Sequence, residues 1–191
     1  ARALMALTTV GVAGRRERVS FGDLGVEQLG AVYESVLEYE PAVAAGGARA
    51  PKRPAGPGPV PAVTLVARGG ARKSSGTFYT PRPITDYLVR HTLGPLVHGA
   101  KPDDILGLRV LDPAMGSGAL LVAACRFLAE AYEAALVRER GRFACDVTDE
   151  ERAGFRRLVA QRCLYGVDLN PIPVHVARLS MWLTTLANGK P

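Results

Sequence analysis

The stretch "VLDPAMGSGALL", residues 110–121, decides the fold. An apolar run ends at Asp112, a glycine-rich turn follows, and apolar residues resume at once. A strand, turn and helix in this order place the acid at the carboxyl end of a strand, where open α/β sheets bind their ligands. Gly116 and Gly118 let the backbone approach a ligand closely, and amides at the start of the helix can donate hydrogen bonds. The stretch therefore predicts a site for a nucleotide-like ligand.

Around this stretch, the second half of the chain alternates between strands and helices. We expect strands at 108–113 and 163–170, and helices at 118–140, 148–162 and 172–188. Thr148 and Glu151 have the spacing of a capping box at the start of the second of these helices. This order implies an α/β fold whose strands are parallel and joined by right-handed crossovers.

The first half of the chain has a less regular pattern. Residues 27–39 show the spacing of a helix that ends before Pro41. Residues 41–61 hold six prolines and four glycines, which makes regular structure improbable there, and 61–68 predict a short strand. A further helix is expected to start near Pro83.

Apolar residues at helical spacing indicate which helix faces are buried. The helix that starts near Pro83 carries Ile84, Tyr87, Leu88 and His91 on one side. In the helix at 172–188, the spacing of Met181 and Trp182 is typical of core residues.

The composition excludes several classes of protein. No apolar run reaches the ~18 residues of a membrane span, and the N-terminus lacks the pattern of a signal peptide. Cys125, Cys145 and Cys163 lie far apart, without the spacing of a zinc site. We therefore expect a cytoplasmic protein with reduced cysteines, no metal and no membrane partner.

The net charge of +6 is concentrated in residues 41–73, which contain six basic residues and no acid. Such a stretch is typical either of a DNA-contacting segment or of a solubilising loop, and both interpretations stay open. The candidates for DNA contact are Arg49, Lys52, Arg53, Arg68, Arg72 and Lys73.

A second acid narrows the class of ligand to one that carries a ribose. "YGVDLNP" places Asp168 at the end of the other strand, where one carboxylate can accept hydrogen bonds from both hydroxyls of a ribose. Leu169 beside it can cover a flat base.

Three other ligand or catalytic motifs fail on spacing. Leu121 replaces the third glycine of a dinucleotide fingerprint, and no phosphate-binding loop motif occurs. Met115 and Ala119 stand where a nucleophile elbow needs glycines, so Ser117 is interpreted as a turn residue.

Three segments in order resemble a known family: "SSGTFYTPRPI" (74–84), "VLDPAMGSGALLVAA" (110–124) and "LYGVDLNPIPVHVARLSMWL" (164–183). They are similar to the first motif regions of adenine-N6 DNA methyltransferases, especially the large modification enzymes of bacterial restriction and phage-defence systems. The resemblance implies S-adenosylmethionine as cofactor, double-stranded DNA as partner, and an incomplete Rossmann-like class I methyltransferase sheet. It divides the chain into a mostly helical lead-in with a basic loop, 1–76, and a partial cofactor-binding domain, 77–191.

The resemblance also implies roles for individual residues. The segment expected to fold over the methionine part of the cofactor comprises Thr77, Phe78, Tyr79 and Thr80. The loop beneath that methionine comprises Asp112, Ala114, Gly116 and Gly118. Asp168 corresponds to the ribose-binding acid, and Leu169 to the residue against the adenine.

One family motif is missing from these 191 residues. Family members hold the target amine with an Asn/Asp-Pro-Pro-aromatic motif, whereas here Asn170-Pro171 is followed by Ile172-Pro173. We therefore expect either a fragment of a longer enzyme, which we favour, or one half of an enzyme whose other half is supplied separately. In both cases the chain is expected to be inactive alone and to hold no catalytic residue. An uncovered sheet edge would then allow self-association.

Two other functions stay open. One is a module of the same fold that acts on RNA or protein. The other is a non-catalytic interaction module.

Overall fold

The computed structural model describes residues 9–12, 15–18, 28, 30, 32, 39–43, 63–67, 80–141 and 143–186. In the N-terminal half, these residues form two antiparallel pairs of strands. β1 (Thr9–Val12) pairs with β2 (Arg15–Arg18), and β3 (Tyr39–Val43) pairs with β4 (Val63–Ala67).

The strand at 61–68 is confirmed as β4, but two other expectations for this half are wrong in part. Tyr39 belongs to β3 rather than to the end of a helix, although residues 28, 30 and 32 are helical. Residues 41–43 have regular structure, because Pro41 and its neighbours pair with the apolar strand β4. Proline is tolerated in an edge strand, so the number of prolines in this segment does not exclude a strand at residues 41–43.

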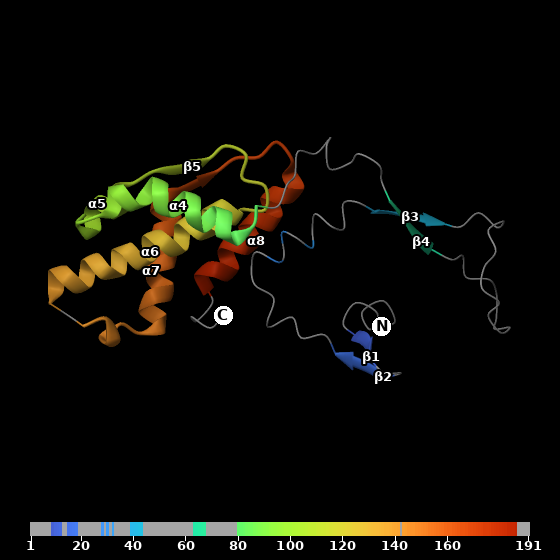
Figure 1. Ribbon diagram of the computed structural model, residues 1–191, viewed down its shortest axis with the longest axis horizontal. Helices are drawn as coiled ribbons and strands as arrows, with labels where there is room; N and C mark the ends of the chain where they lie inside the picture. The colour runs from blue at the N-terminus through green and yellow to red at the C-terminus, as the bar shows by residue number, and fades with distance from the viewer. Residues whose placement is uncertain are drawn as a thin grey trace.

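From residue 80 onward, helices alternate with two short strands (Figure 1). The elements are α4 (Arg82–Val97), α5 (Pro102–Gly107), β5 (Val110–Asp112), α6 (Ala119–Arg140), the 3-10 turn η1 (Ala144–Asp146), α7 (Asp149–Cys163), β6 (Leu164–Gly166) and α8 (Pro171–Leu186).

α6 is the central helix of this part, and it contacts α4, α5, α7, α8 and both strands (Figure 1). It is bracketed by two glycines in the left-handed region, Gly118 with φ +85° and Gly141 with φ +63°. The run from Leu121 to Cys125 is buried along its whole length, together with Leu128. The core of the molecule therefore surrounds α6.

β5 and β6 are parallel, as the sequence predicts, and Leu111 pairs with Tyr165 in their register. Val110 and Leu164 pack against the core around α6. The next pair along the strands faces the other way, since Leu111 is 61% and Tyr165 47% exposed. Helices therefore cover one face of the sheet at this level.

The predicted capping box of α7 is confirmed. The Thr148 N–H donates to Glu151 Oε2 at 2.8 Å, and the Glu151 N–H donates to Thr148 Oγ1 at 3.2 Å. Two backbone donors at the helix start are thus satisfied reciprocally.

The expected faces of two helices need correction. α4 buries Thr85, Val89 and Leu93, whereas the side with Ile84, Tyr87, Leu88 and His91 is exposed. In α8, Met181 packs against the core, but Trp182 is 58% exposed. The buried face of α8 consists of small residues, because α6 approaches closely there: a Cβ on Gly118 would lie 3.1 Å from the Cβ of Ala177.

Within the described residues, no helix is both long enough and apolar enough to cross a membrane. Cys125 and Cys163 are buried and Cys145 is exposed, all as free thiols.

Candidate functional site

A pocket of about 480 Å³ lies at the carboxyl ends of β5 and β6. Its wall comes from the end of β5, the glycine-rich turn, the start of α6, the residues after β6, one residue of α4 and one residue before α4. The lining residues are Thr80, Leu88, Asp112, Pro113, Ala114, Met115, Gly116, Ser117, Ala119, Leu120, Asp168 and Leu169. Its volume is within the range of pockets that bind small molecules and cofactors.

The turn between β5 and α6 is held by backbone and carboxylate hydrogen bonds. Asp112 Oδ1 accepts from the Ala114 N–H at 3.1 Å, which closes the turn immediately after the strand. Gly116 adopts φ +53° and Gly118 φ +85°, and glycine is the residue that enters this left-handed region at no steric cost. The two glycines therefore set the shape of the turn.

The carboxylate of Asp168 joins the two strand ends. Its Oδ2 accepts from the Gly116 N–H at 2.9 Å, and its Oδ1 accepts from the Asn170 N–H at 2.8 Å. An ionised carboxylate has about four acceptor positions. Capacity therefore remains for further donors, such as a pair of ligand hydroxyls.

The ladder between the strands continues into the pocket. The Val167 N–H donates to the Asp112 carbonyl at 2.9 Å, and the Met115 N–H donates to the Val167 carbonyl at 3.0 Å. Beneath this ladder, the Met115 side chain lies directly against Gly166, where an added Cβ would overlap Met115 Sδ. Gly166 thus leaves the space in which Met115 packs under the turn.

The structure brings most of the described candidates into one place. Those that line the pocket are Thr80, Asp112, Ala114, Gly116, Asp168 and Leu169. The side chain of Leu169 is fully exposed at the rim. Gly118 is an exception: it lies behind the turn at the start of α6, where it permits close packing against Ala177.

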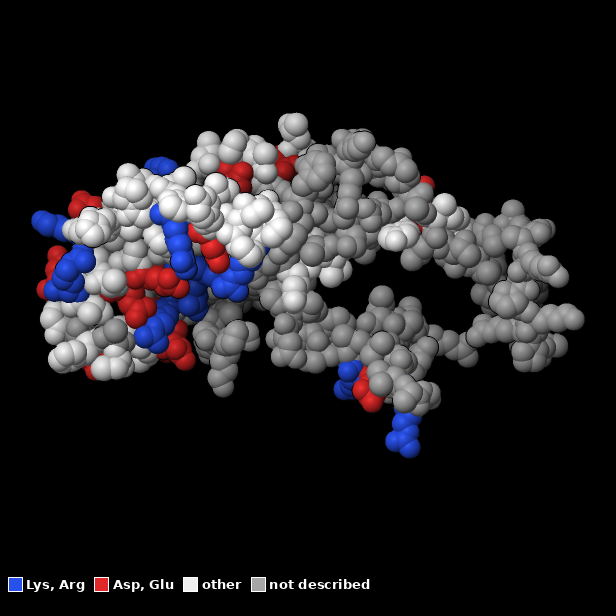
Figure 2. All heavy atoms as spheres, viewed as in Figure 1, with Lys and Arg blue, Asp and Glu red and all other residues white. Residues whose placement is uncertain are grey.

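Other candidates lie outside the described residues: Thr77, Phe78, Tyr79, Arg49, Lys52, Arg53, Arg68, Arg72 and Lys73. On the face shown in Figure 2, acidic and basic side chains of the helical part are intermingled. The described residues therefore present no patch of a single charge on that face.

Sequence reasoning did not identify several residues of the pocket wall: Leu88, Pro113, Met115, Ser117, Ala119 and Leu120. Five of these belong to the glycine-rich stretch itself, so their closeness to Asp112 was the available signal. Leu88 comes from α4, and its place in the wall depends on how that helix packs against α6.

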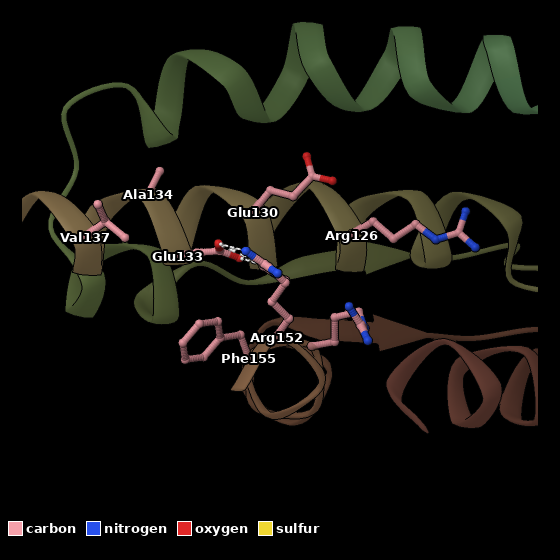
Figure 3. A pocket seen from close by; sticks show the side chains of 9 residues that line it. Arg126, Glu130, Glu133, Ala134, Val137, Arg152 and Phe155 are labelled. Atoms are coloured by element: carbon pink, nitrogen blue, oxygen red, sulfur yellow. Dashed lines mark hydrogen bonds and ion pairs between the residues drawn. The ribbon is translucent and has the colours of Figure 1, made fainter. Parts of the chain in front are cut away.

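A second pocket of about 570 Å³ lies between α6 and α7 (Figure 3). Glu133 on α6 points toward Arg152 on α7, and Arg152 Nε and Nη2 donate to the Glu133 carboxylate at 3.1–3.2 Å. Arg152 also pairs with Asp149 at 3.4 Å. The Glu133–Arg152 pair joins α6 to α7, whereas Asp149 lies on α7 itself. Two charged residues of this pocket are therefore paired with each other, and the pocket at the strand ends is the better candidate for a ligand.

Comparisons with known proteins show what the chain is similar to. The family model described as N-6 DNA methylase matches residues 67–190, which include the linings of both pockets. The chain is also 27% identical over 165 residues to a presumed type II restriction enzyme and methyltransferase of Methanocaldococcus jannaschii. That match covers 66% of this chain and 13% of the relative's length. No solved structure matches the chain.

Proposed function

The chain belongs to the N-6 DNA methylase family, and on that premise we propose that it is the cofactor-binding portion of a DNA adenine-N6 methyltransferase. The enzyme would use S-adenosylmethionine and act in a restriction-modification or phage-defence system. The observation that carries the proposal is the meeting of Asp112, the Gly116 turn and Asp168 in one pocket.

The donors and acceptors of this pocket fit the cofactor. Asp168 has acceptor capacity for the two ribose hydroxyls, and the exposed Leu169 side chain beside it can lie against the adenine. The turn from Asp112 to Gly116 would support the methionine part. When bound, the cofactor supplies a methyl group on a sulfonium, while the residues of this chain bind and orient it.

We propose further that β5 and β6 belong to a Rossmann-like class I methyltransferase sheet. Their parallel pairing and the acid at each strand end support this assignment.

The target amine needs acceptors to hold it, and the family's Asn/Asp-Pro-Pro-aromatic motif does not occur in these 191 residues. The chain would therefore bind cofactor without transferring the methyl group.

The family match and the relative's described activity favour DNA over RNA or protein as the substrate of the intact enzyme. Intact pocket acids and glycines favour cofactor binding over a purely structural module.

Ligand-dependent thermal stability tests the proposal. S-adenosylhomocysteine at about 100 times its dissociation constant should add ~2.7 kcal/mol to the free energy of unfolding, since it binds only the folded chain. NAD at the same concentration should leave the melting temperature unchanged, because the third glycine of a dinucleotide site is absent. Stabilisation by NAD but not by S-adenosylhomocysteine would refute the proposal.

The basic stretch is proposed to contact DNA phosphates in the intact enzyme. Neutralising its six candidates should flatten the dependence of DNA affinity on salt, because each lost phosphate contact reduces counterion release. If the dependence of DNA affinity on salt is unchanged, the basic stretch contributes to solubility and does not contact DNA.

A further inference from the structure

Asn170 lies between the pocket acid and the first turn of α8. Its backbone N–H donates to Asp168 Oδ1 at 2.8 Å, and its side-chain Oδ1 accepts from the Ile172 N–H at 3.1 Å. Pro171 stands first in the helix, where a missing N–H has no consequence. Asn170 therefore has the place and the hydrogen bond of an N-cap residue.

The two bonds of Asn170 are coupled through its own backbone. The cap to Ile172 fixes the turn in which the Asn170 N–H points at Asp168. On the other side, the Gly116 N–H donates to Asp168 Oδ2 at 2.9 Å. The Asp168 carboxylate thus accepts one backbone hydrogen bond from each side. Only the bond from Asn170 can be altered through a side chain, because glycine has none.

We propose that Asn170 is a positioning residue: by capping α8, it fixes the orientation of the Asp168 carboxylate and with it the glycine turn. The inference rests on the proposed function for its consequence, since the ribose hydroxyls would meet a carboxylate that is already oriented. Preorganisation of this kind lowers the ordering cost of binding.

Replacement of the cap tests the inference through cofactor affinity. Asn170→Ala should weaken the binding of S-adenosylhomocysteine about fivefold, which corresponds to the typical free energy of one N-cap, ~1 kcal/mol. Asn170→Ser should restore most of the affinity, because serine caps helices nearly as well as asparagine.

Thr148→Ala is the matched control. It removes the cap of α7, a similar loss at a helix start whose residues do not line the pocket. This variant should lose stability to a similar degree and keep the parent's cofactor affinity. If Asn170→Ala binds as tightly as the parent, or if Thr148→Ala loses as much affinity, the positioning role is refuted.

A readout without cofactor separates this inference from the proposed function. Hydrogen exchange of the Gly116 amide, followed by NMR, should be faster in Asn170→Ala than in the parent and unchanged in Thr148→Ala. Faster exchange in a chain whose parent binds no S-adenosylhomocysteine would refute the proposed function and leave the positioning of Asp168 standing. Unchanged exchange in Asn170→Ala would refute the positioning role whatever the chain binds.

Discussion

The carboxylate of Asp168 accepts a hydrogen bond from the backbone N–H of Gly116 at 2.9 Å, across 52 positions of the sequence. This bond joins the two motifs that the sequence shows separately, the glycine-rich turn after β5 and the acid after β6. A charged acceptor makes such a bond stronger than one between neutral groups. The pocket is therefore a single structural unit rather than two neighbouring loops.

Gly166 is predicted to be needed for full stability and cofactor affinity, because the Met115 side chain fills the space beside it. In Gly166→Ala the new methyl would overlap Met115 Sδ and lie 2.7 Å from Leu121 Cδ1. Overpacking of this kind costs ~1–3 kcal/mol, so the melting temperature and the affinity for S-adenosylhomocysteine should both fall. The double variant with Met115→Ala should recover part of both losses.

Gly107→Ala is the control for this substitution, because a Cβ at Gly107 meets nothing within 4 Å. It should leave both quantities close to those of the parent. If Gly107→Ala and Gly166→Ala change the melting temperature and the cofactor affinity by the same amount, the packing described for Met115 is contradicted.

The hydroxyl of Ser180 is buried in α8, and its Oγ has no hydrogen-bond partner among the described residues. A buried unsatisfied polar group costs ~1–3 kcal/mol, so Ser180→Ala should raise the melting temperature. Thr184→Val is the contrasting variant, because the Thr184 hydroxyl donates to the Ser180 carbonyl at 2.8 Å. It should lower the melting temperature, and a loss of stability in Ser180→Ala would contradict this account.

Burial raises the pKa of the Cys125 thiol to about 12 from its ordinary value of 9.0. The folded chain therefore keeps a proton that the unfolded chain loses, and stability should decline as the pH rises from about 9 toward 12. The slope from one thiol is ~1.4 kcal/mol per pH unit. Urea unfolding at pH 8 and pH 10 should show a smaller decline in Cys125→Ala than in the parent.

Cys145→Ala provides the comparison for this pH effect, since Cys145 is exposed. It should decline with pH as the parent does. An identical decline in Cys125→Ala would show that the thiol at 125 ionises as readily in the folded chain as in the unfolded one.

The 191-residue chain alone is predicted to transfer no methyl group to DNA. Alignment of the reacting groups can lower a barrier by ~7–11 kcal/mol, and the motif that would align the adenine amine is absent from this sequence. Tritium from labelled S-adenosylmethionine should therefore stay out of mixed-sequence DNA at high protein concentration. Incorporation at adenine N6 above background would show that the acceptor half of the site lies within these residues.

The sequence predicts the second half of the fold well because its signals are local. The capping box at Thr148, the apolar run before Asp112 and the glycine at the start of α6 each act within a few residues. The order of strands and helices then implies a parallel pair, which β5 and β6 form.

The buried faces of helices were harder to predict, since they depend on neighbours. In α4, Thr85 is buried because its hydroxyl donates to the Arg82 carbonyl at 2.9 Å, so the polar residue needs no solvent. In α8, the close approach of α6 admits small residues such as Ala177 and turns the large Trp182 outward.

Within the site, spacing identified Asp112 and Asp168 but not the bond that joins Asp168 to the turn. That bond depends on how β5 and β6 pair, and the pairing juxtaposes residues far apart in the sequence. The role of Asn170 was hidden for the same reason, because its cap and its N–H are meaningful only beside a placed Asp168.

The most direct test of the central claim is calorimetric titration of the 191-residue chain with S-adenosylhomocysteine, beside Asp168→Ala and the control Asp86→Ala. Asp86 is an acid of α4 that pairs with Arg82 and does not line the pocket. The account predicts one binding site in the parent and the control, and an affinity at least tenfold lower in Asp168→Ala. The reason is that each charge-assisted hydrogen bond to a ligand contributes ~1.5–3 kcal/mol. Absence of binding to the parent, or equal affinity in Asp168→Ala, would contradict it.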